Sequence, residues 1–177
     1  FTAISTFLPK GFIAFPMAYL LVLGEIDLSV GSTVALSATL LGISYNSGLS
    51  MGAAILIALG CGLVCGLLNG LILAKFTELA PMIVTLGTMT LYRGISQMIL
   101  GSESSGGLHN CRWFYNIYYA RLGPVPYVFL VFCLAAVAFG FVLHKTVFGR
   151  QVYAIGSNRT TALYSGVPVQ RVRIICY

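Results

Sequence analysis

Two acidic residues within an apolar part of the sequence are the first candidates for chemistry. Glu25 and Asp27 lie in the segment GEIDLSVGS, residues 24–32, between two apolar runs. At membrane depth an Asp side chain costs about 2.5–3.5 kcal/mol, so it needs a cation, backbone donors or a water-lined cavity. Ser29 could begin a new helix there, with Asp27 near its positive end. Two interpretations stay open: a helix cap at a break in a membrane span, and part of a polar solute path.

A second set of polar side chains is spaced along two later apolar segments. Asn69 lies in LLNGLILAK, and Thr85 and Thr88 lie in PMIVTLGTMT. Hydroxyls in membrane helices often bond to carbonyls of their own helix. They can also donate to and accept from the hydroxyls of a polyhydroxylated solute. The candidate substrate pathway therefore consists of Asp27, Ser29, Asn69, Thr85 and Thr88.

The third candidate is a basic, glycine-punctuated segment, residues 149–172, which reads GRQVYAIGSNRTTALYSGVPVQRV. Residues 158–165 could form a short helix capped by Asn158, and Pro168 would stop whatever precedes it. A short amphipathic helix parallel to a membrane could insert into a groove on a soluble partner. An ordinary basic loop between helices is the alternative on composition alone.

The sequence carries no signature of catalysis or of metal binding. It contains no GxxxxGK[ST], HExxH or GxSxG motif and no glycine-rich dinucleotide turn. The five cysteines show no CxxC or Cys/His metal spacing, and we expect them to be small apolar packing groups. We therefore predict no catalytic residue, no metal site and no cofactor bound by this chain.

Composition and hydropathy define the elements that must position these residues. Hydrophobic residues make up 58% of the chain and charged residues 8%, whereas soluble domains carry about 25% charged residues. A membrane span needs about 20 apolar residues, and segments 49–74, 79–100 and 124–143 qualify. Segments 11–23 and 30–43 are too short to cross alone, which predicts a broken helix with its break inside protein. The expected fold is an all-α, polytopic transmembrane helix bundle in a single domain, residues 1–177.

Basic residues predict how the chain is oriented. Five of the ten Lys and Arg residues follow segment 124–143, so that side is expected to be cytoplasmic, and the net charge of +6 reflects basic loops rather than nucleic-acid binding. Residues 145–173 then form a cytoplasmic loop and residues 101–123 an external loop. Aromatic residues around Trp113 suggest an interfacial belt, with contact to an external partner protein as the alternative.

Small residues recur every four positions along segment 49–74. Such a stripe lets another helix backbone approach closely. We expect packing within the bundle, with a subunit interface as the alternative. The stripe consists of Ala54, Ala58, Gly62, Gly66 and Gly70.

Several of these motifs together resemble one family. IDLSVGS, LLNGLILAK, APMIVTLGTMTLYRG and the segment 149–172 are similar to the ribose-type permeases, the bacterial ATP-binding-cassette (ABC) permeases that import monosaccharides. Glu25, Ser157 and Thr161 stand where that family commonly has glycine, glycine and alanine. The resemblance implies that segment 145–173 couples the permease to an ATPase. The matching coupling residues are Gly149, Arg150, Ala154, Ile155, Gly156, Asn158, Ala162 and Gly166.

The resemblance also implies function and partners. It implies a type II-like ABC importer permease that is not itself an enzyme and that moves a monosaccharide or similar small polyol by alternating access. A separate cytoplasmic ATPase would use ATP and magnesium, a periplasmic or lipoprotein sugar-binding protein would deliver the solute, and a second permease subunit would complete the pore. The expected location is the bacterial inner membrane, and among solutes ribose-like, rhamnose-like or autoinducer-2-like polyols fit best.

Two further expectations complete the sequence analysis. The alternative function is an ion-coupled secondary transporter that uses Glu25 and Asp27 in a broken helix. Because the chain begins at Phe1 and ends within an apolar run, we expect it to be an incomplete permease that is unstable in detergent on its own.

Overall fold

The computed structural model describes the whole chain except residues 1, 102–110, 113–115, 117–119 and 123–124. The regular secondary structure of the described part is helical apart from one short antiparallel pair of strands, which confirms the all-α expectation. The elements in chain order are α1 (Thr2–Leu23), α2 (Val30–Asn46), α3 (Met51–Lys75), α4 (Pro81–Leu100), β1 (Arg121–Leu122), β2 (Val125–Pro126), α6 (Tyr127–Lys145), α7 (Val147–Ser157), α8 (Arg159–Tyr164) and α9 (Val169–Cys176).

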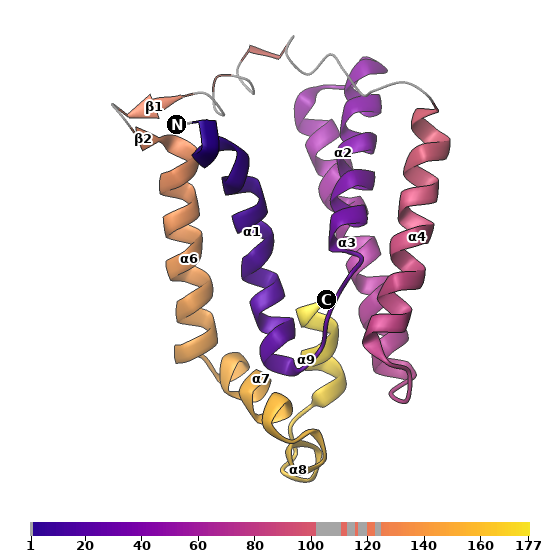
Figure 1. Ribbon diagram of the computed structural model, residues 1–177, viewed down its shortest axis with the longest axis vertical. Helices are drawn as coiled ribbons and strands as arrows, with labels where there is room; N and C mark the ends of the chain where they lie inside the picture. Colours follow the sequence, from indigo (N-terminus) through magenta and orange to yellow (C-terminus); the bar gives the residue numbers. More distant parts are fainter. Residues whose placement is uncertain (1, 102–110, 113–115, 117–119, 123–124) are drawn as a thin grey trace.

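The long helices form two groups (Figure 1). One group holds α1, α6 and α7, and the other holds α2, α3 and α4. The short helix α9 lies between them and packs against α1 and α7 on one side and α3 on the other. The turn after α3 and helices α7 and α8 share the lower end in Figure 1, whereas the α2–α3 turn and the strands share the upper end. Among the described residues, successive connections therefore lie at alternate ends of the bundle.

Two of the three segments expected to span a membrane are confirmed as long, apolar helices. In the described part, α3 and α6 are the helices long and apolar enough to cross. The third segment folds as the 20-residue helix α4, but polar residues such as Thr88, Arg93 and Gln97 lower its hydropathy. Local sequence sets the ends of these helices: the Ser50 hydroxyl accepts from the amide of Ala53 at the start of α3, and Pro81 begins α4.

The first helix corrects the sequence analysis. We expected segment 11–23 to be too short to cross alone, but α1 continues back through Lys10 to Thr2 and has 22 residues. At about 1.5 Å per residue this helical length reaches that of a span, although its apolar part, Phe7–Leu23, is one of the shorter apolar helices. The break is also different in form: after α1 the chain reverses at Gly24, whose φ is 81°. The segment of residues 24–29, here called the link, then rises to the start of the 17-residue α2 partway up the molecule (Figure 1).

Different side chains hold the two groups together. Between α1 and α6, aromatic rings pack in a column that includes Phe15 and Phe139, 5.6 Å apart, and the Tyr19 hydroxyl donates to the Phe139 carbonyl at 2.6 Å. Between the helices of the other group, the Tyr92 hydroxyl donates to the Cys65 carbonyl at 3.1 Å. Buried polar groups inside an apolar bundle need such partners.

The small-residue stripe on α3 packs within the chain, as expected. A side chain at Gly70 would meet the backbone of Ile174 in α9, and one at Gly66 would meet the carbonyl of Tyr177. Farther up, a side chain at Gly62 would touch the Ser37 hydroxyl of α2. The stripe therefore allows two neighbours to approach the α3 backbone, which is the packing role of small residues in membrane helices.

Candidate functional site

The link gathers buried polar side chains at the start of α2. The Asp27 Oδ1 atom accepts from both the amide and the hydroxyl of Ser29, each at 2.7 Å. Ser29 is the N-cap residue of α2, but its hydroxyl accepts no hydrogen bond from the first backbone amides of the helix. The hydroxyl instead donates to Asp27 Oδ1. The structure contains features of both interpretations of this motif. Asp27 lies at the positive end of a helix, as a helix cap would, and it belongs to a larger polar cluster, as a residue of a solute path would.

The link and two helices contribute to that cluster, defined here as Asp27, Ser29, Asn69 and Thr85. Asn69 of α3 donates through Nδ2 to the Ser29 hydroxyl at 2.8 Å. The hydroxyl of Thr85 in α4 lies 3.4 Å from the carbonyl of Ile26 in the link, and 3.0 Å from the carbonyl of Pro81 in its own helix. The structure thus brings together four of the five residues predicted for a substrate pathway.

The fifth residue, Thr88, is not part of this cluster. Its hydroxyl bonds to the Thr85 carbonyl at 3.3 Å, which is the helix-internal bonding considered as the alternative. The four clustered side chains are buried; Asp27, Ser29 and Asn69 bond to one another, whereas Thr85 bonds to backbone carbonyls. Among the described residues, Asn69 Oδ1 is a buried acceptor that has no hydrogen-bond partner.

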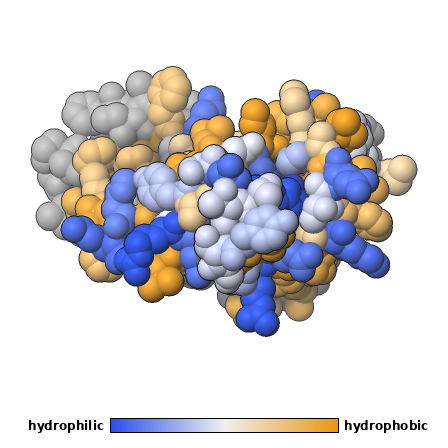
Figure 2. All heavy atoms as spheres, turned by 90° about the horizontal axis from the view of Figure 1, so that it is seen from below, coloured by the Kyte–Doolittle hydropathy of each residue, from blue (hydrophilic) through white to orange (hydrophobic). Residues whose placement is uncertain are grey.

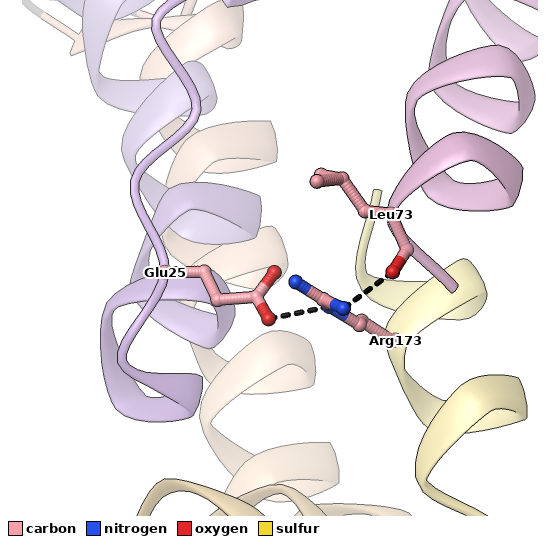
Figure 3. A network of polar contacts seen from close by, with 3 residues as sticks. All are labelled: Glu25, Leu73 and Arg173. Atoms are coloured by element: carbon pink, nitrogen blue, oxygen red, sulfur yellow. Dashed lines mark hydrogen bonds and ion pairs between the residues drawn. The ribbon is translucent and has the colours of Figure 1, made fainter. Parts of the chain in front are cut away.

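A charged pair that the sequence analysis did not assign lies beside the cluster (Figure 3). Arg173 of α9 places Nε 2.5 Å from Glu25 Oε1 in the link, and its Nη1 donates to the Leu73 carbonyl near the end of α3. Arg173 is 2% exposed and Glu25 9%. The sequence predicts that an acid at membrane depth needs a cationic partner. It does not indicate which basic residue forms the ion pair with Glu25.

The second candidate site is the lower end of the molecule, where α7 and α8 lie. Figure 2 views this end and shows hydrophilic side chains gathered across its middle, flanked by apolar ones. Exposed basic residues here include Lys75, Lys145, Arg150 and Arg171. Burial and then the charge of Arg173 lower the pKa of Arg159, whereas Glu25 raises it, and the guanidinium still stays charged at neutral pH.

Segment 145–173 is more helical than the sequence predicted. The expected short helix is confirmed as α8, with Asn158 Oδ1 accepting from the Thr161 amide at 3.0 Å. The preceding residues also form a helix, α7, which was read as loop because glycines punctuate it. Thr146 caps α7 by accepting from the amide of Gly149 at 3.2 Å.

Two glycines of α7 lie where other chain segments come very close. A side chain at Gly149 would collide with the Leu143 carbonyl at the end of α6, and one at Gly156 would collide with the Val22 carbonyl at the end of α1. These contacts fix α7 across the ends of two long helices. Glycine is therefore required for packing at both positions.

The predicted coupling residues divide into two sets in the structure. Buried members pack α7 and α8 against neighbouring helices. The exposed members lie on the outer surface of this end, except that Gly156 also contacts the end of α1. The buried members are Gly149, Ile155 and Ala162, Ala154 is half-buried, and the exposed members are Arg150, Gly156, Asn158 and Gly166. The most exposed apolar side chains of α8 are Leu163 and Tyr164, at 62% and 87%, and the sequence analysis had not singled them out.

A groove of about 420 Å³ runs beside these exposed residues. It is lined by Thr77, Arg159, Thr160, Leu163, Tyr164 and Gln170, among others. Among the described residues, no group of three or more His, Cys, Asp and Glu could hold a metal ion. The predicted external loop, with Trp113, lies largely outside the described residues.

Comparison with known proteins decides the family. The family model described as "Branched-chain amino acid transport system / permease component" matches residues 1–177. The chain belongs to this family. Its members are permease components, that is, transporters rather than enzymes.

Two relatives of this permease-family chain confirm the resemblance found in the motifs. The autoinducer 2 import system permease protein of Escherichia coli strain K12 is 38% identical over 180 residues, which cover 98% of this chain and 53% of the relative. The ribose import permease protein of Bacillus subtilis strain 168 is 40% identical over 171 residues, covering 95% and 52%. The chain therefore spans about half the length of the curated relatives it matches. No solved structure matches it.

Proposed function

We propose that this chain is part of the membrane-spanning permease subunit of an ABC importer for a monosaccharide or similar small polyol. The observation that carries the proposal is the similarity to two import permeases over nearly the whole chain, one named for ribose and one for autoinducer 2. The buried polar cluster supports it, because hydroxyl and amide groups inside an apolar bundle suit a polyhydroxylated solute. Asn69 Oδ1, with no partner among the described residues, is the acceptor we assign to a solute hydroxyl.

Energy would come from a separate ATPase that hydrolyses ATP with magnesium and docks on α7 and α8. The exposed Leu163 and Tyr164, the groove beside them and the surrounding basic residues support this docking, since an apolar anchor within a charged rim suits a protein groove. A substrate-binding protein would bind at the opposite end of the chain, and a second permease subunit, identical or homologous, would pair with this one.

The orientation follows from charge. Basic residues concentrated at the lower end favour placing it in the cytoplasm, which makes segment 145–173 a cytoplasmic coupling loop and segment 101–123 an external loop. The chain would then cross the bacterial inner membrane several times. The two long apolar helices support this location.

Ion coupling through Glu25 and Asp27 is not favoured. Glu25 is paired with Arg173, and Asp27 accepts two hydrogen bonds from Ser29, so neither carboxylate is a free ligand for an ion. The curated relatives are named import permeases of ribose and autoinducer 2 systems.

Uptake by the complete protein in proteoliposomes tests the proposal. The permease, its ATPase and its binding protein would be supplied with ATP and with labelled ribose, rhamnose, autoinducer 2 or leucine. We expect ATP-dependent uptake of one of the polyols and none of leucine. Uptake that needs a proton or sodium gradient and no ATPase would contradict the proposal.

A further inference from the structure

The Glu25–Arg173 pair lies where the two helix groups are joined. Helix α9 and the link both pass between the groups, and the pair connects one to the other (Figures 1 and 3). The bond from Arg173 to the Leu73 carbonyl extends this connection to α3. Any displacement of one group against the other must therefore act on these three segments.

A stabilising role alone does not account for a buried pair in this place. The free energy lost by removing two charges from water is about as large as the free energy gained from their attraction, so buried ion pairs contribute little net stability. Glu25 Oε2 also lacks a hydrogen-bond partner among the described residues. A buried pair can instead fix the relative position of the segments that carry it.

The contacts on the Arg173 side lead to the lower end of the molecule. Val169 and Val172, on the same helix, are buried in one apolar cluster with Val152 and Ile155 of α7 and Ala162 of α8. Because this cluster is close-packed, α9 must follow when α7 and α8 shift.

The contacts on the Glu25 side lead to the polar cluster. Asp27 lies two residues after Glu25 in the link, and its carboxylate accepts a hydrogen bond from the Ser29 hydroxyl. The same hydroxyl accepts a hydrogen bond from the side-chain amide of Asn69 in α3. The link between Glu25 and Ser29 contains no regular secondary structure, so its backbone can change conformation without breaking a helix.

We propose that Arg173 is a positioning residue: through Glu25 it holds the link, and it transmits displacement of α7, α8 and α9 to the polar cluster. This inference rests on the proposed function, which supplies the ATPase that displaces α7 and α8. It assigns a role in transport to two residues that neither touch the solute nor face the ATPase.

Thiol labelling in the link tests the inference without knowledge of the solute. Ile26 is 45% exposed, so an Ile26→Cys variant of the complete permease, with the native cysteines replaced, can react with N-ethylmaleimide. The rate would be measured in the assembled complex with and without ATP and vanadate. We expect nucleotide to change the rate at least about twofold, and Arg173→Gln to abolish that change while ATP hydrolysis continues.

Two further variants separate positioning from stability. Arg93→Gln removes an equal charge from an exposed position in α4, outside the end assigned to ATPase docking, and it should leave the nucleotide response intact. The apolar pair Glu25→Leu with Arg173→Met removes both buried charges, so the complex should assemble. We expect this double variant still to show no nucleotide response.

The outcomes distinguish this inference from the proposed function. A normal response in Arg173→Gln, or a restored response in the apolar double variant, would overturn the positioning role alone. If the unmodified complex neither responds to nucleotide nor takes up solute with ATP, the proposed function fails and the inference fails with it.

Discussion

At the scale of single residues, the bundle is organised around polar side chains that an apolar environment forces to find partners. Asp27, Ser29 and Asn69 bond to one another between the link and α3. Glu25 finds its cation on α9. Since each unpartnered group would cost free energy in this environment, these contacts determine where the link lies relative to α3 and α9.

Replacing Asn69 tests the cluster. Asn69→Ala removes the donor to Ser29, and we expect a loss of stability of about 0.6–2 kcal/mol, the range measured for hydrogen bonds between membrane helices. Thermal unfolding of the complete protein in detergent would measure it. Thr90→Ala is the matched control, because this exposed hydroxyl bonds only to carbonyls of its own helix. Equal effects of the two substitutions would show that Asn69 does not hold the cluster.

Much of the cluster could be predicted from residue types alone. An acid at membrane depth needs partners, and polar side chains in apolar segments can line a solute path. These arguments select Asp27, Ser29, Asn69 and Thr85, which the structure brings together, but also Thr88, which bonds within its own helix. Arg173 could not be selected in this way, because several basic residues follow the last long apolar segment and sequence spacing does not indicate which one turns inward. That choice depends on how α9 packs against α3.

At the scale of elements, α7 joins the two long helices of its group at the lower end. Its Gly149 and Gly156 allow the carbonyls at the ends of α6 and α1 to approach the helix backbone. A short helix fixed at two points in this way moves together with the helices it touches. This is the property that a coupling element requires.

Alanine at either glycine should disturb this packing. We expect Gly149→Ala and Gly156→Ala each to lower the stability of the complete permease by about 1–3 kcal/mol, because the added methyl group meets backbone rather than a movable side chain. Gly140→Ala in α6 is the control: nothing lies near its added methyl group, and alanine favours a helix. Unfolding midpoints that are the same for all three variants would contradict the close approaches.

The elements were predictable where apolar residues run without interruption. Helices α3 and α6 follow directly from such runs. The apolar run of α1 begins only after Lys10, so its length alone does not predict that the helix continues back to Thr2; a lysine near a helix end can extend toward water. Helix α7 was missed because its glycines resemble loop signals, whereas here they serve close packing.

At the scale of the whole molecule, the arrangement in two helix groups joined by α9 and the link is the feature most relevant to transport. Alternation between outward and inward openings requires parts that move against each other around a fixed site. The sequence could not predict which helices group together, because α1 packs with α6 although more than 100 residues separate Tyr19 from its partner Phe139. Such long-range pairing depends on the shapes of packed surfaces.

The proposed orientation predicts which side of the membrane each end faces. In a chain with its native cysteines replaced, Tyr164→Cys should react with an impermeant maleimide only in inside-out vesicles. Ser47→Cys, in the exposed turn between α2 and α3, should react only in right-side-out vesicles. Reaction of both thiols from one side would contradict the assigned topology.

Crosslinking between α8 and the ATPase tests the central claim most directly. Leu163→Cys and Tyr164→Cys would be paired with cysteines in the groove of the ATPase, and Asn158 would be left unchanged because it caps α8. The buried Ala162→Cys serves as the control that should not react. We predict crosslinks at Leu163 and Tyr164 whose yield changes with nucleotide. No crosslink at either position, together with uptake that persists without the ATPase and stops when the ion gradient is removed, would contradict the account.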